Sequence, residues 1–161
     1  MEIERKFVIK KVDVDKIQNI VAIYDIEQIY LDYGEDVRIR ERRNIRTGEI
    51  EYFYTEKNDV EYATRDEKEK EIDENEYSKL YRRMDRSLSP IYKRRYVVNS
   101  EGSKLELDYY TFWTSQAIME IELGQLKEDF KIPKWIKIIK EVTGDKRYSN
   151  KGLAKNQGVI R

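Results

Sequence analysis

The sequence contains no cysteine and no histidine. Without cysteine, disulfide bonds, thiol catalysis and zinc–thiolate sites are excluded. Without histidine, the chain lacks the side chain that most often serves as a general base and as a ligand for soft metals. Any bound metal is therefore expected to be a hard cation held by carboxylates, with Mg²⁺ or Mn²⁺ favoured over Zn²⁺.

Long apolar runs are also missing, and prolines and glycines are few. No stretch approaches the roughly 18 apolar residues of a membrane-spanning helix, and the acidic N-terminus does not resemble a signal peptide. We therefore expect a cytoplasmic protein that binds no membrane. With two prolines, seven glycines and no linker-like segment, the 161 residues predict a single domain over residues 1–161.

Charge, by contrast, is abundant and balanced. Lysine and arginine total 32, aspartate and glutamate also total 32, and charged residues make up 40% of the chain. Thirteen tyrosines, four phenylalanines and two tryptophans argue against disorder. The segment RIRERRNIR is basic, but the zero net charge and interleaved acids argue against nucleic-acid binding. A folded domain of this composition must set opposite charges against each other or against a ligand.

Most of the chain shows the two-residue alternation of β-strands, with valine, isoleucine, tyrosine and threonine well represented. The predicted strands cover residues 2–9, 26–33, 36–44, 50–58, 64–72, 91–99, 104–112 and 117–124. Hairpin following hairpin predicts a mainly β (α+β) fold, an eight-stranded antiparallel closed β-barrel with a few flanking helices.

Four short helical segments are expected around these strands. Apolar spacing predicts helices over residues 12–22 and 133–143, the second beginning with a proline. A third helix is predicted to start at Asp73, with Glu76 completing a box-like N-cap, and Ser149 is predicted to cap a last short turn.

The opening MEIERKF places charges on every second residue of a predicted strand. Glu2, Glu4 and Lys6 therefore share one face, and Ile3 and Phe7 lie on the other. The same pattern recurs on six further strands. For any one strand, a solvated outer face is the simplest explanation. The repetition with alternating sign suggests instead that these faces turn inward.

An inward arrangement would gather fifteen charged residues, eight acidic and seven basic. They are Glu2, Glu4, Glu67, Glu69, Glu106, Asp108, Glu120 and Glu122, with Lys6, Arg38, Arg40, Lys57, Arg65, Lys93 and Arg95. A dry interior with these charges would be very unfavourable, so the lumen must be open to water. Arginine and lysine suit phosphate oxygens, and clustered carboxylates suit divalent cations. The pattern therefore indicates a metal-bound polyphosphate as ligand.

These residues, in this order along essentially the whole chain, resemble the CYTH domain proteins, also called triphosphate tunnel metalloenzymes. The resemblance rests on the Glu-x-Glu-x-Lys opening, the basic strands and the two later acidic strands, and extends to the C-terminal segment DKRYSNKGLA. It implies an eight-stranded antiparallel tunnel that binds a triphosphate with Mg²⁺ or Mn²⁺. The absence of added segments makes the chain similar to bacterial members that cleave inorganic tripolyphosphate.

The resemblance implies an enzyme that hydrolyses inorganic tripolyphosphate to pyrophosphate and phosphate, acting as a monomer or homodimer. The alternatives are a thiamine- or nucleoside-triphosphatase, a class IV-type adenylate cyclase, or a non-catalytic polyphosphate- or nucleotide-binding module. With neither histidine nor cysteine, no side chain has an ordinary pKa near neutrality. If the metal or a lysine activates the water, turnover with Mg²⁺ should rise from pH 7 to about 9 or beyond, which is the outcome we expect. A carboxylate base would instead give a plateau by about pH 7.

The resemblance also assigns roles to individual residues. The metal ligands are Glu2, Glu4, Glu120 and Glu122. The phosphate-binding residues are Lys6, Arg38, Arg40, Lys57, Arg65, Lys93 and Arg95. Lys6 contacts phosphate or helps to activate the attacking water, and Glu67, Glu69 and Asp108 hold a second ion or orient that water.

Overall fold

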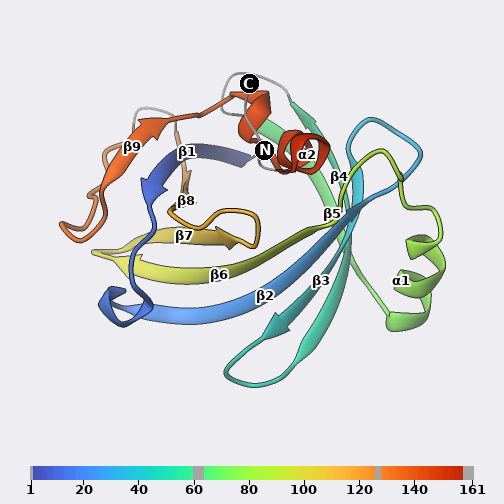
Figure 1. Cartoon of the computed structure of the whole chain (residues 1–161), viewed down its shortest axis with the longest axis horizontal. Helices are drawn as coiled ribbons and strands as arrows, with labels where there is room; N and C mark the ends of the chain where they lie inside the picture. Colours follow the sequence, from blue (N-terminus) through green and yellow to red (C-terminus); the bar gives the residue numbers. More distant parts are fainter. Residues whose placement is uncertain (1, 60–63, 126–127, 158–161) are drawn as a thin grey trace.

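The computed structural model describes residues 2–59, 64–125 and 128–157, and its main feature is one strongly curved antiparallel sheet (Figure 1). The strands are β1 (Glu2–Lys10), β2 (Ile20–Tyr30), β3 (Val37–Asn44), β4 (Ile50–Asp59), β5 (Thr64–Ile72), β6 (Ile91–Ser100), β7 (Ser103–Tyr110), β8 (Gln116–Leu123) and β9 (Ile138–Glu141). Their order is β5-β4-β3-β2-β6-β7-β8-β1-β9. The helices are α1 (Glu74–Tyr81) and α2 (Asn150–Asn156), with 3-10 turns at Val14–Lys16 and Lys146–Tyr148.

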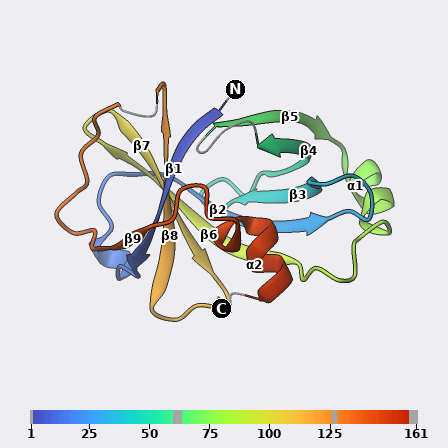
Figure 2. The ribbon, with the colours of Figure 1, turned by 90° about the horizontal axis from the view of Figure 1, so that it is seen from above.

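The predicted closed eight-stranded barrel is confirmed only in part. The sheet curls until β1 meets β5, where Glu2 pairs with Arg65 and Ile3 pairs with Thr64 among the residues that the structure describes (Figure 2). Farther along, the same edge of β1 pairs with the ninth strand, β9, which the sequence did not predict. Since β9 takes this edge from Phe7 to Ile9, β5 cannot pair with β1 along its full length.

Two of the helix predictions are wrong. Residues 12–22 form only the 3-10 turn and the start of β2, and Val14 and Val21 are more than half exposed. Ile17 is buried in the core, but Val14 and Val21 are not, so the helical spacing of these residues does not correspond to one buried helix face. Residues 133–143 include β9, where β-branched isoleucines suit a strand and the edge of β1 provides backbone hydrogen-bond partners.

The two helix starts predicted from capping residues are confirmed. The Asp73 carboxylate accepts a hydrogen bond from the Glu76 N–H at 2.8 Å and begins α1. The Ser149 hydroxyl accepts one from the Gly152 N–H at 3.0 Å and begins α2. Each cap satisfies a backbone donor that the helix itself leaves unpaired. Gly152 is needed at its position, because a Cβ there would lie 2.1 Å from the Lys146 carbonyl oxygen.

The apolar core lies in three clusters, two of them on the outer face of the sheet. One packs residues of β1, β6, β7 and β8 against residues 130–136, which precede β9, and another packs β2 and β3 against α1. The third includes Val8, Tyr110 and Ile118 and packs against Leu153 of α2. Val8, Tyr110 and Ile118 each lie two positions along their strand from Lys6, Asp108 and Glu120, so their side chains point to the same, inner face of the sheet. The inner face is therefore apolar beside α2 and charged beyond it.

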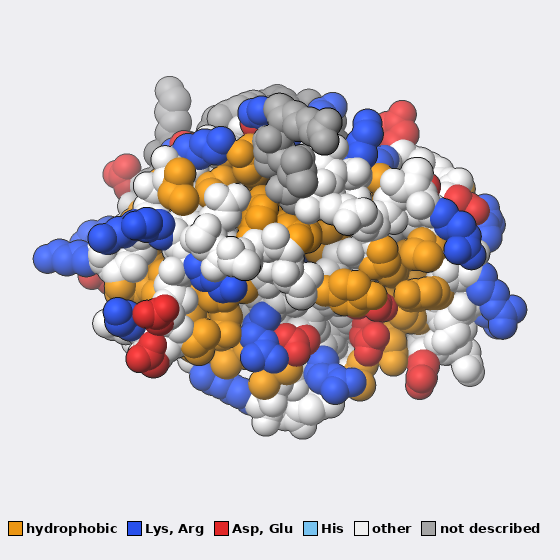
Figure 3. Space-filling model, in the orientation of Figure 1, with side chains coloured by type: hydrophobic (Ala, Val, Ile, Leu, Met, Phe, Trp, Pro, Cys, Tyr) orange, Lys and Arg blue, Asp and Glu red, His pale blue; other side chains and the backbone are white. Residues whose placement is uncertain are grey.

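The molecular surface carries both signs of charge. On the face drawn in Figure 3, lysine and arginine side chains are interspersed with aspartate and glutamate. In the described ranges no helix is long and apolar enough to cross a membrane.

Candidate active site

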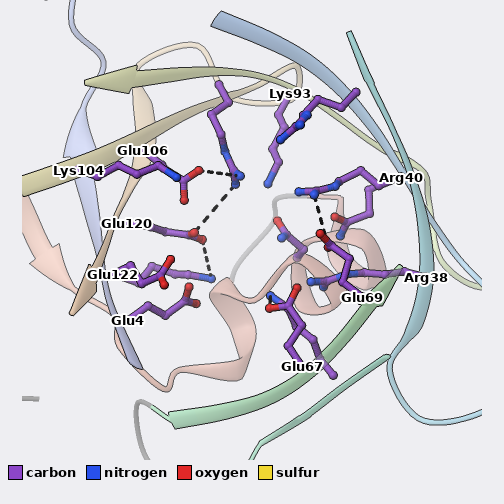
Figure 4. A pocket seen from close by; sticks show the side chains of 16 residues that line it. Glu4, Arg38, Arg40, Glu67, Glu69, Lys93, Lys104, Glu106, Glu120 and Glu122 are labelled. Carbon is purple, nitrogen blue, oxygen red and sulfur yellow. Dashed lines mark hydrogen bonds and ion pairs between the residues drawn. The ribbon is translucent and has the colours of Figure 1, made fainter. Parts of the chain in front are cut away.

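The charged part of the inner face forms a cavity of about 530 Å³ (Figure 4). All of its lining residues except Gln28 and Asn150 are charged. The lining residues are Glu4, Lys6, Gln28, Arg38, Arg40, Arg42, Lys57, Glu67, Glu69, Lys93, Arg95, Lys104, Glu106, Glu120, Glu122 and Asn150. They come from the eight strands β1 to β8 and from α2, so strand alternation brings together residues that are far apart in the sequence.

One side of the cavity is rich in carboxylates, contributed by β1, β7 and β8. Glu4 lies directly opposite Glu122 across the β1–β8 pair, and Glu106 lies opposite Glu120 across the β7–β8 pair. Figure 4 shows these four side chains on the same side. Like charges opposite each other in neighbouring strands are unfavourable. This side is therefore suited to a bound cation.

Lys6 and Arg95 keep the Glu120 carboxylate ionised. The Lys6 Nζ lies 3.4 Å from a Glu120 oxygen, and Arg95 approaches the other oxygen at 4.0 Å. Burial alone would raise the pKa of Glu120, but Lys6, Arg95 and Lys93 outweigh it and lower the pKa to about 2. Glu120 is consequently a carboxylate throughout the physiological pH range.

Arginines of β3 form the facing side. The Arg38 Nη1 donates to the Tyr30 hydroxyl at 3.2 Å, and the Arg40 guanidinium lies 3.5 Å from a Glu69 oxygen. Burial, followed by the charge of Arg95, lowers the pKa of Arg40 to about 10. A buried cation surrounded by other cations is stabilised by an anion, so this side is suited to phosphate.

Lys93 and Arg95 of β6 are fixed by a carboxylate behind the cavity wall. The Asp108 side chain is fully buried, 2.8 Å from the Lys93 Nζ and 2.7 Å from the Arg95 Nε. Burial opposes its ionisation, but the two cations hold the pKa of Asp108 well below its usual range. Burial also lowers the pKa of Lys93 to about 8, despite the opposing attraction of Asp108.

The structure brings together most of the residues that the sequence predicted. Eleven of the predicted site residues line the cavity: Glu4, Lys6, Arg38, Arg40, Lys57, Glu67, Glu69, Lys93, Arg95, Glu120 and Glu122. Asp108 lies behind the wall rather than in it. The predicted positions Glu2 and Arg65 have side chains that lie outside the described part of the structure.

Four further residues line the cavity without having been predicted there: Gln28, Arg42, Lys104 and Asn150. Arg42 shares its strand face with Arg38 and Arg40, and Lys104 shares one with Glu106, so alternation carried a signal for both. Gln28 is uncharged and gave none. Asn150 begins α2 and accepts a hydrogen bond from the Tyr110 hydroxyl at 2.6 Å.

The carboxylates present fit a hard divalent cation that shares its ligands with substrate. Within residues 2–59, 64–125 and 128–157, no three acidic side chains come close enough together to hold an ion by themselves. Mg²⁺, however, is usually bound through one or two carboxylates together with phosphate oxygens and water. Glu4, Glu120 and Glu122 provide oxygen donors of this kind on one side of the cavity.

Comparison with known proteins places the chain in a family. No protein-family model matches the chain. The inorganic triphosphatase of Acetivibrio thermocellus is 31% identical over 156 residues, covering 96% of this chain and 94% of that protein.

Solved structures show the same architecture. The inorganic triphosphatase NE1496 superposes with a TM-score of 0.59 and 27% identity, over 96% of this chain and 95% of that one. The PH1012 protein from Pyrococcus horikoshii OT3, at 22% identity, matches with a TM-score of 0.53 over 78% of this chain and 80% of that one, and shows the shared fold alone. With a relative this similar along nearly its full length, the chain belongs to the CYTH, or triphosphate tunnel metalloenzyme, family.

Proposed function

We propose that this protein hydrolyses inorganic tripolyphosphate to pyrophosphate and phosphate, with Mg²⁺ or Mn²⁺ bound. Relatives named inorganic triphosphatase support triphosphate hydrolysis. The observation that carries the proposal is a single charged cavity in which Arg38 and Arg40 lie on one side and the carboxylates of Glu4, Glu120 and Glu122 gather on the other. A linear polyphosphate would bind to the arginines, and the cation that accompanies it would bind to the carboxylates.

The basic residues would bind the phosphates and stabilise the charge that develops on the departing pyrophosphate. Arg38, Arg40 and Arg95 offer planar guanidinium groups that match two phosphate oxygens at once, and Lys93 adds a point charge. Because Asp108 fixes Lys93 and Arg95 before substrate arrives, little reorganisation is needed. We assign Asp108 this positioning role, because it is fully buried behind the wall.

On the acidic side, Glu4, Glu120 and Glu122 would hold the divalent cation. When bound, that ion would neutralise phosphate charge and act as a Lewis acid. Lys6 lines the cavity beside these carboxylates, with its Nζ 3.4 Å from a Glu120 oxygen and 3.5 Å from the Tyr148 carbonyl oxygen. It would contact the terminal phosphoryl group.

Hydrolysis requires a water molecule to attack the terminal phosphorus as the bridging P–O bond breaks. Glu67 and Glu69 line the cavity from β5 and would orient this water. The bond broken releases pyrophosphate, and the water oxygen ends on the released phosphate.

A phosphate-release screen tests the proposal. Tripolyphosphate, pyrophosphate, thiamine triphosphate and ATP are each incubated with Mg²⁺, with Mn²⁺ or with EDTA. We expect tripolyphosphate to be the fastest substrate and EDTA to abolish the reaction. The Glu4→Gln variant should lose turnover by at least about 100-fold and keep the parent's circular-dichroism spectrum, because it removes one charge at nearly constant shape. Glu49→Gln, in the exposed β3–β4 turn, is the matched control.

Two results would contradict the proposal. If tripolyphosphate raises the melting temperature but no phosphate is released with either metal, the protein binds polyphosphate without hydrolysing it. If Glu4→Gln retains activity close to that of the parent, the carboxylate-rich side does not hold the catalytic metal.

A further inference from the structure

Lys6 lies at a gap in the pairing of β1. Along one edge of this strand, β5 pairs with Glu2 and Ile3, and β9 pairs with Phe7 to Ile9. Among the residues that the structure describes, no strand pairs with this edge at Lys6 itself. Lys6 is only 5% exposed, and a buried backbone N–H needs an acceptor. The placement of this cavity residue therefore depends on contacts other than the strand ladder.

The segment that follows β9 provides these contacts. The Lys6 N–H donates to the Thr143 hydroxyl oxygen at 3.0 Å, and the Lys6 carbonyl oxygen accepts from the Val142 N–H at 2.8 Å. The Thr143 side chain is buried, so it takes the place that water would otherwise occupy beside this N–H. The same segment reaches the charged end of the side chain, where the Tyr148 carbonyl oxygen lies 3.5 Å from the Lys6 Nζ. Residues 142–148 thus hold Lys6 both at its backbone and at its ammonium group.

The Thr143 hydroxyl is oriented to accept from Lys6 because its own proton is used elsewhere. The hydroxyl oxygen lies 2.6 Å from a Glu141 carboxylate oxygen, but 3.5 Å from the Lys6 carbonyl oxygen. Hydrogen bonds from Arg5 lower the pKa of Glu141, so its side chain is an ionised carboxylate that can only accept. The hydroxyl proton therefore points to Glu141, and an oxygen lone pair faces the Lys6 N–H.

Arg5 holds Glu141 in place from the face of β1 opposite Lys6. Its Nε and Nη2 donate to the two Glu141 oxygens at 2.9 and 2.6 Å. The Arg5 guanidinium carbon lies 5.4 Å from the Phe7 ring centroid and 5.0 Å from that of Phe130. A bidentate pair with aromatic contacts restricts the guanidinium to one geometry. A continuous set of contacts therefore runs from the outer face of the sheet to the backbone of a residue that lines the cavity.

We propose that Thr143 is a positioning residue for the hydrolytic reaction, acting through the Lys6 backbone to place the Lys6 Nζ against the terminal phosphoryl group. This inference rests on the proposed function, in which Lys6 contacts that group. Along its other edge Lys6 pairs with Glu120, which remains when Thr143 is changed. Without the hydroxyl, however, the buried N–H would have no acceptor, and the backbone would move to find one. A displacement of about 1 Å at a reacting group can cost about 100-fold in rate.

Steady-state kinetics with tripolyphosphate and Mg²⁺, combined with thermal unfolding, test this role. Thr143→Val keeps the shape of the side chain and removes the hydroxyl. We expect kcat to fall about 10- to 100-fold and KM to change by less than about threefold, because the arginines still bind the substrate. Thr143→Ser restores the hydroxyl and should recover kcat to within about threefold of the parent.

Thr47→Val is the matched control. The Thr47 hydroxyl also accepts a backbone N–H, that of Glu49 at 3.2 Å, but it lies in the exposed β3–β4 turn. This variant should keep the parent's kcat and KM. If Thr143→Val lowers the melting temperature but the folded enzyme keeps the parent's kcat, the hydroxyl is purely structural and the proposal is overturned.

Glu141→Gln provides the decisive measurement if Thr143→Val folds poorly. The amide of the new side chain can donate to the Thr143 oxygen in competition with the Lys6 N–H, so kcat should fall several-fold. The lost ion pair with Arg5 is about a third exposed, so the melting temperature should change little. A kcat equal to that of the parent would overturn the proposal.

Amide hydrogen exchange at Lys6, followed by NMR in the substrate-free protein, separates this inference from the proposed function. Thr143→Val should accelerate exchange at Lys6 at least about tenfold relative to Ile9, farther along β1. Unchanged exchange would show that the hydroxyl does not hold Lys6, whatever the enzyme does. If exchange accelerates as expected but the parent releases no phosphate from tripolyphosphate, the proposed function fails and the reaction role of Thr143 fails with it.

Discussion

The two basic parts of the cavity pair their charges in different ways. On β6 and β7, Lys93 and Arg95 contact the fully buried Asp108 at 2.8 and 2.7 Å. On β3 and β5, Arg40 and Glu69 are 3.5 Å apart, and the Glu69 side chain is 33% exposed. The contacts of Asp108 are short and buried, and its carboxylate binds two cations at once. The Arg40–Glu69 contact is longer and partly exposed to water.

This difference indicates two roles for ion pairs within one site. A buried, fully hydrogen-bonded set cannot exchange partners without leaving a charge unpaired, so it fixes its cations in place. A longer, partly exposed pair contributes less stability than a buried one, so the Glu69 carboxylate can give way to a phosphate oxygen at smaller cost. We infer that β6 presents preformed phosphate contacts, whereas β3 presents cations that exchange Glu69 for substrate.

Removing the buried carboxylate should have the largest effect. Asp108→Asn leaves Lys93 and Arg95 buried with too little negative charge, which should cost about 3–5 kcal/mol of unfolding free energy. For a chain of this length, the melting temperature should fall by about 6–20 °C. Thermal unfolding followed by circular dichroism measures the change.

Glu69→Gln is the matched variant on the open side of the cavity. Its pair with Arg40 should contribute less than about 1 kcal/mol, so the melting temperature should change little. Equal destabilisation by the two substitutions would show that the buried and the partly exposed ion pairs contribute equally to stability.

Removing an exchangeable cation should weaken binding without weakening the fold. Arg40→Gln should reduce tripolyphosphate affinity by about 10- to 100-fold, because a charge-assisted contact is lost. The apo protein should melt at an unchanged or slightly higher temperature, since Arg40 is surrounded by Arg38, Arg42 and Arg95. Calorimetry and thermal unfolding, with Arg94→Gln as an outward-facing control, measure both effects. A large fall in melting temperature would instead make Arg40 a structural residue.

Strand alternation alone predicted much of the inner face. Glu4 and Lys6, or Arg38 and Arg40, share a face whatever the rest of the chain does, because side chains in a strand alternate. Alternation tells which face of the sheet a side chain points to, but not how deeply that side chain is buried. Asp108 has the same phase as Glu106, yet it is buried behind the wall whereas Glu106 lines the cavity.

Pairing between distant segments could not be predicted from local patterns. β9 forms against β1, more than 120 residues away in the chain, so its isoleucines gave a helical spacing but adopt a strand. The same pairing limits the contact between β1 and β5, and so decides how far the sheet closes. By contrast, the N-caps Asp73 and Ser149 depend on neighbours three residues away, which is why the sequence predicted them correctly.

The pKa of Lys93 is another property that composition could not predict. Lysine ordinarily titrates near 10.5, but burial lowers the pKa of this side chain to about 8 in the folded protein. Between pH 8 and 10.5 the unfolded chain therefore binds more protons at this residue than the folded chain does. By linkage, the contribution of Lys93 to stability rises with pH across that window. Its charge, which phosphate binding requires, disappears over the same window in the free protein.

The smallest expected effect follows from this titration. For tripolyphosphate hydrolysis, kcat/KM reports groups of the free enzyme, whereas kcat reports the substrate complex. We expect kcat/KM to fall several-fold relative to kcat above about pH 8, as Lys93 loses its proton. In the complex, bound phosphate raises the pKa of Lys93, so kcat should still climb toward pH 9. Lys93→Arg retains the charge at all these pH values and should abolish the relative fall. If the parent and Lys93→Arg show the same pH dependence of kcat/KM, the charge of Lys93 is not needed for substrate binding. Of the two β6 cations, Arg95 alone would then bind phosphate.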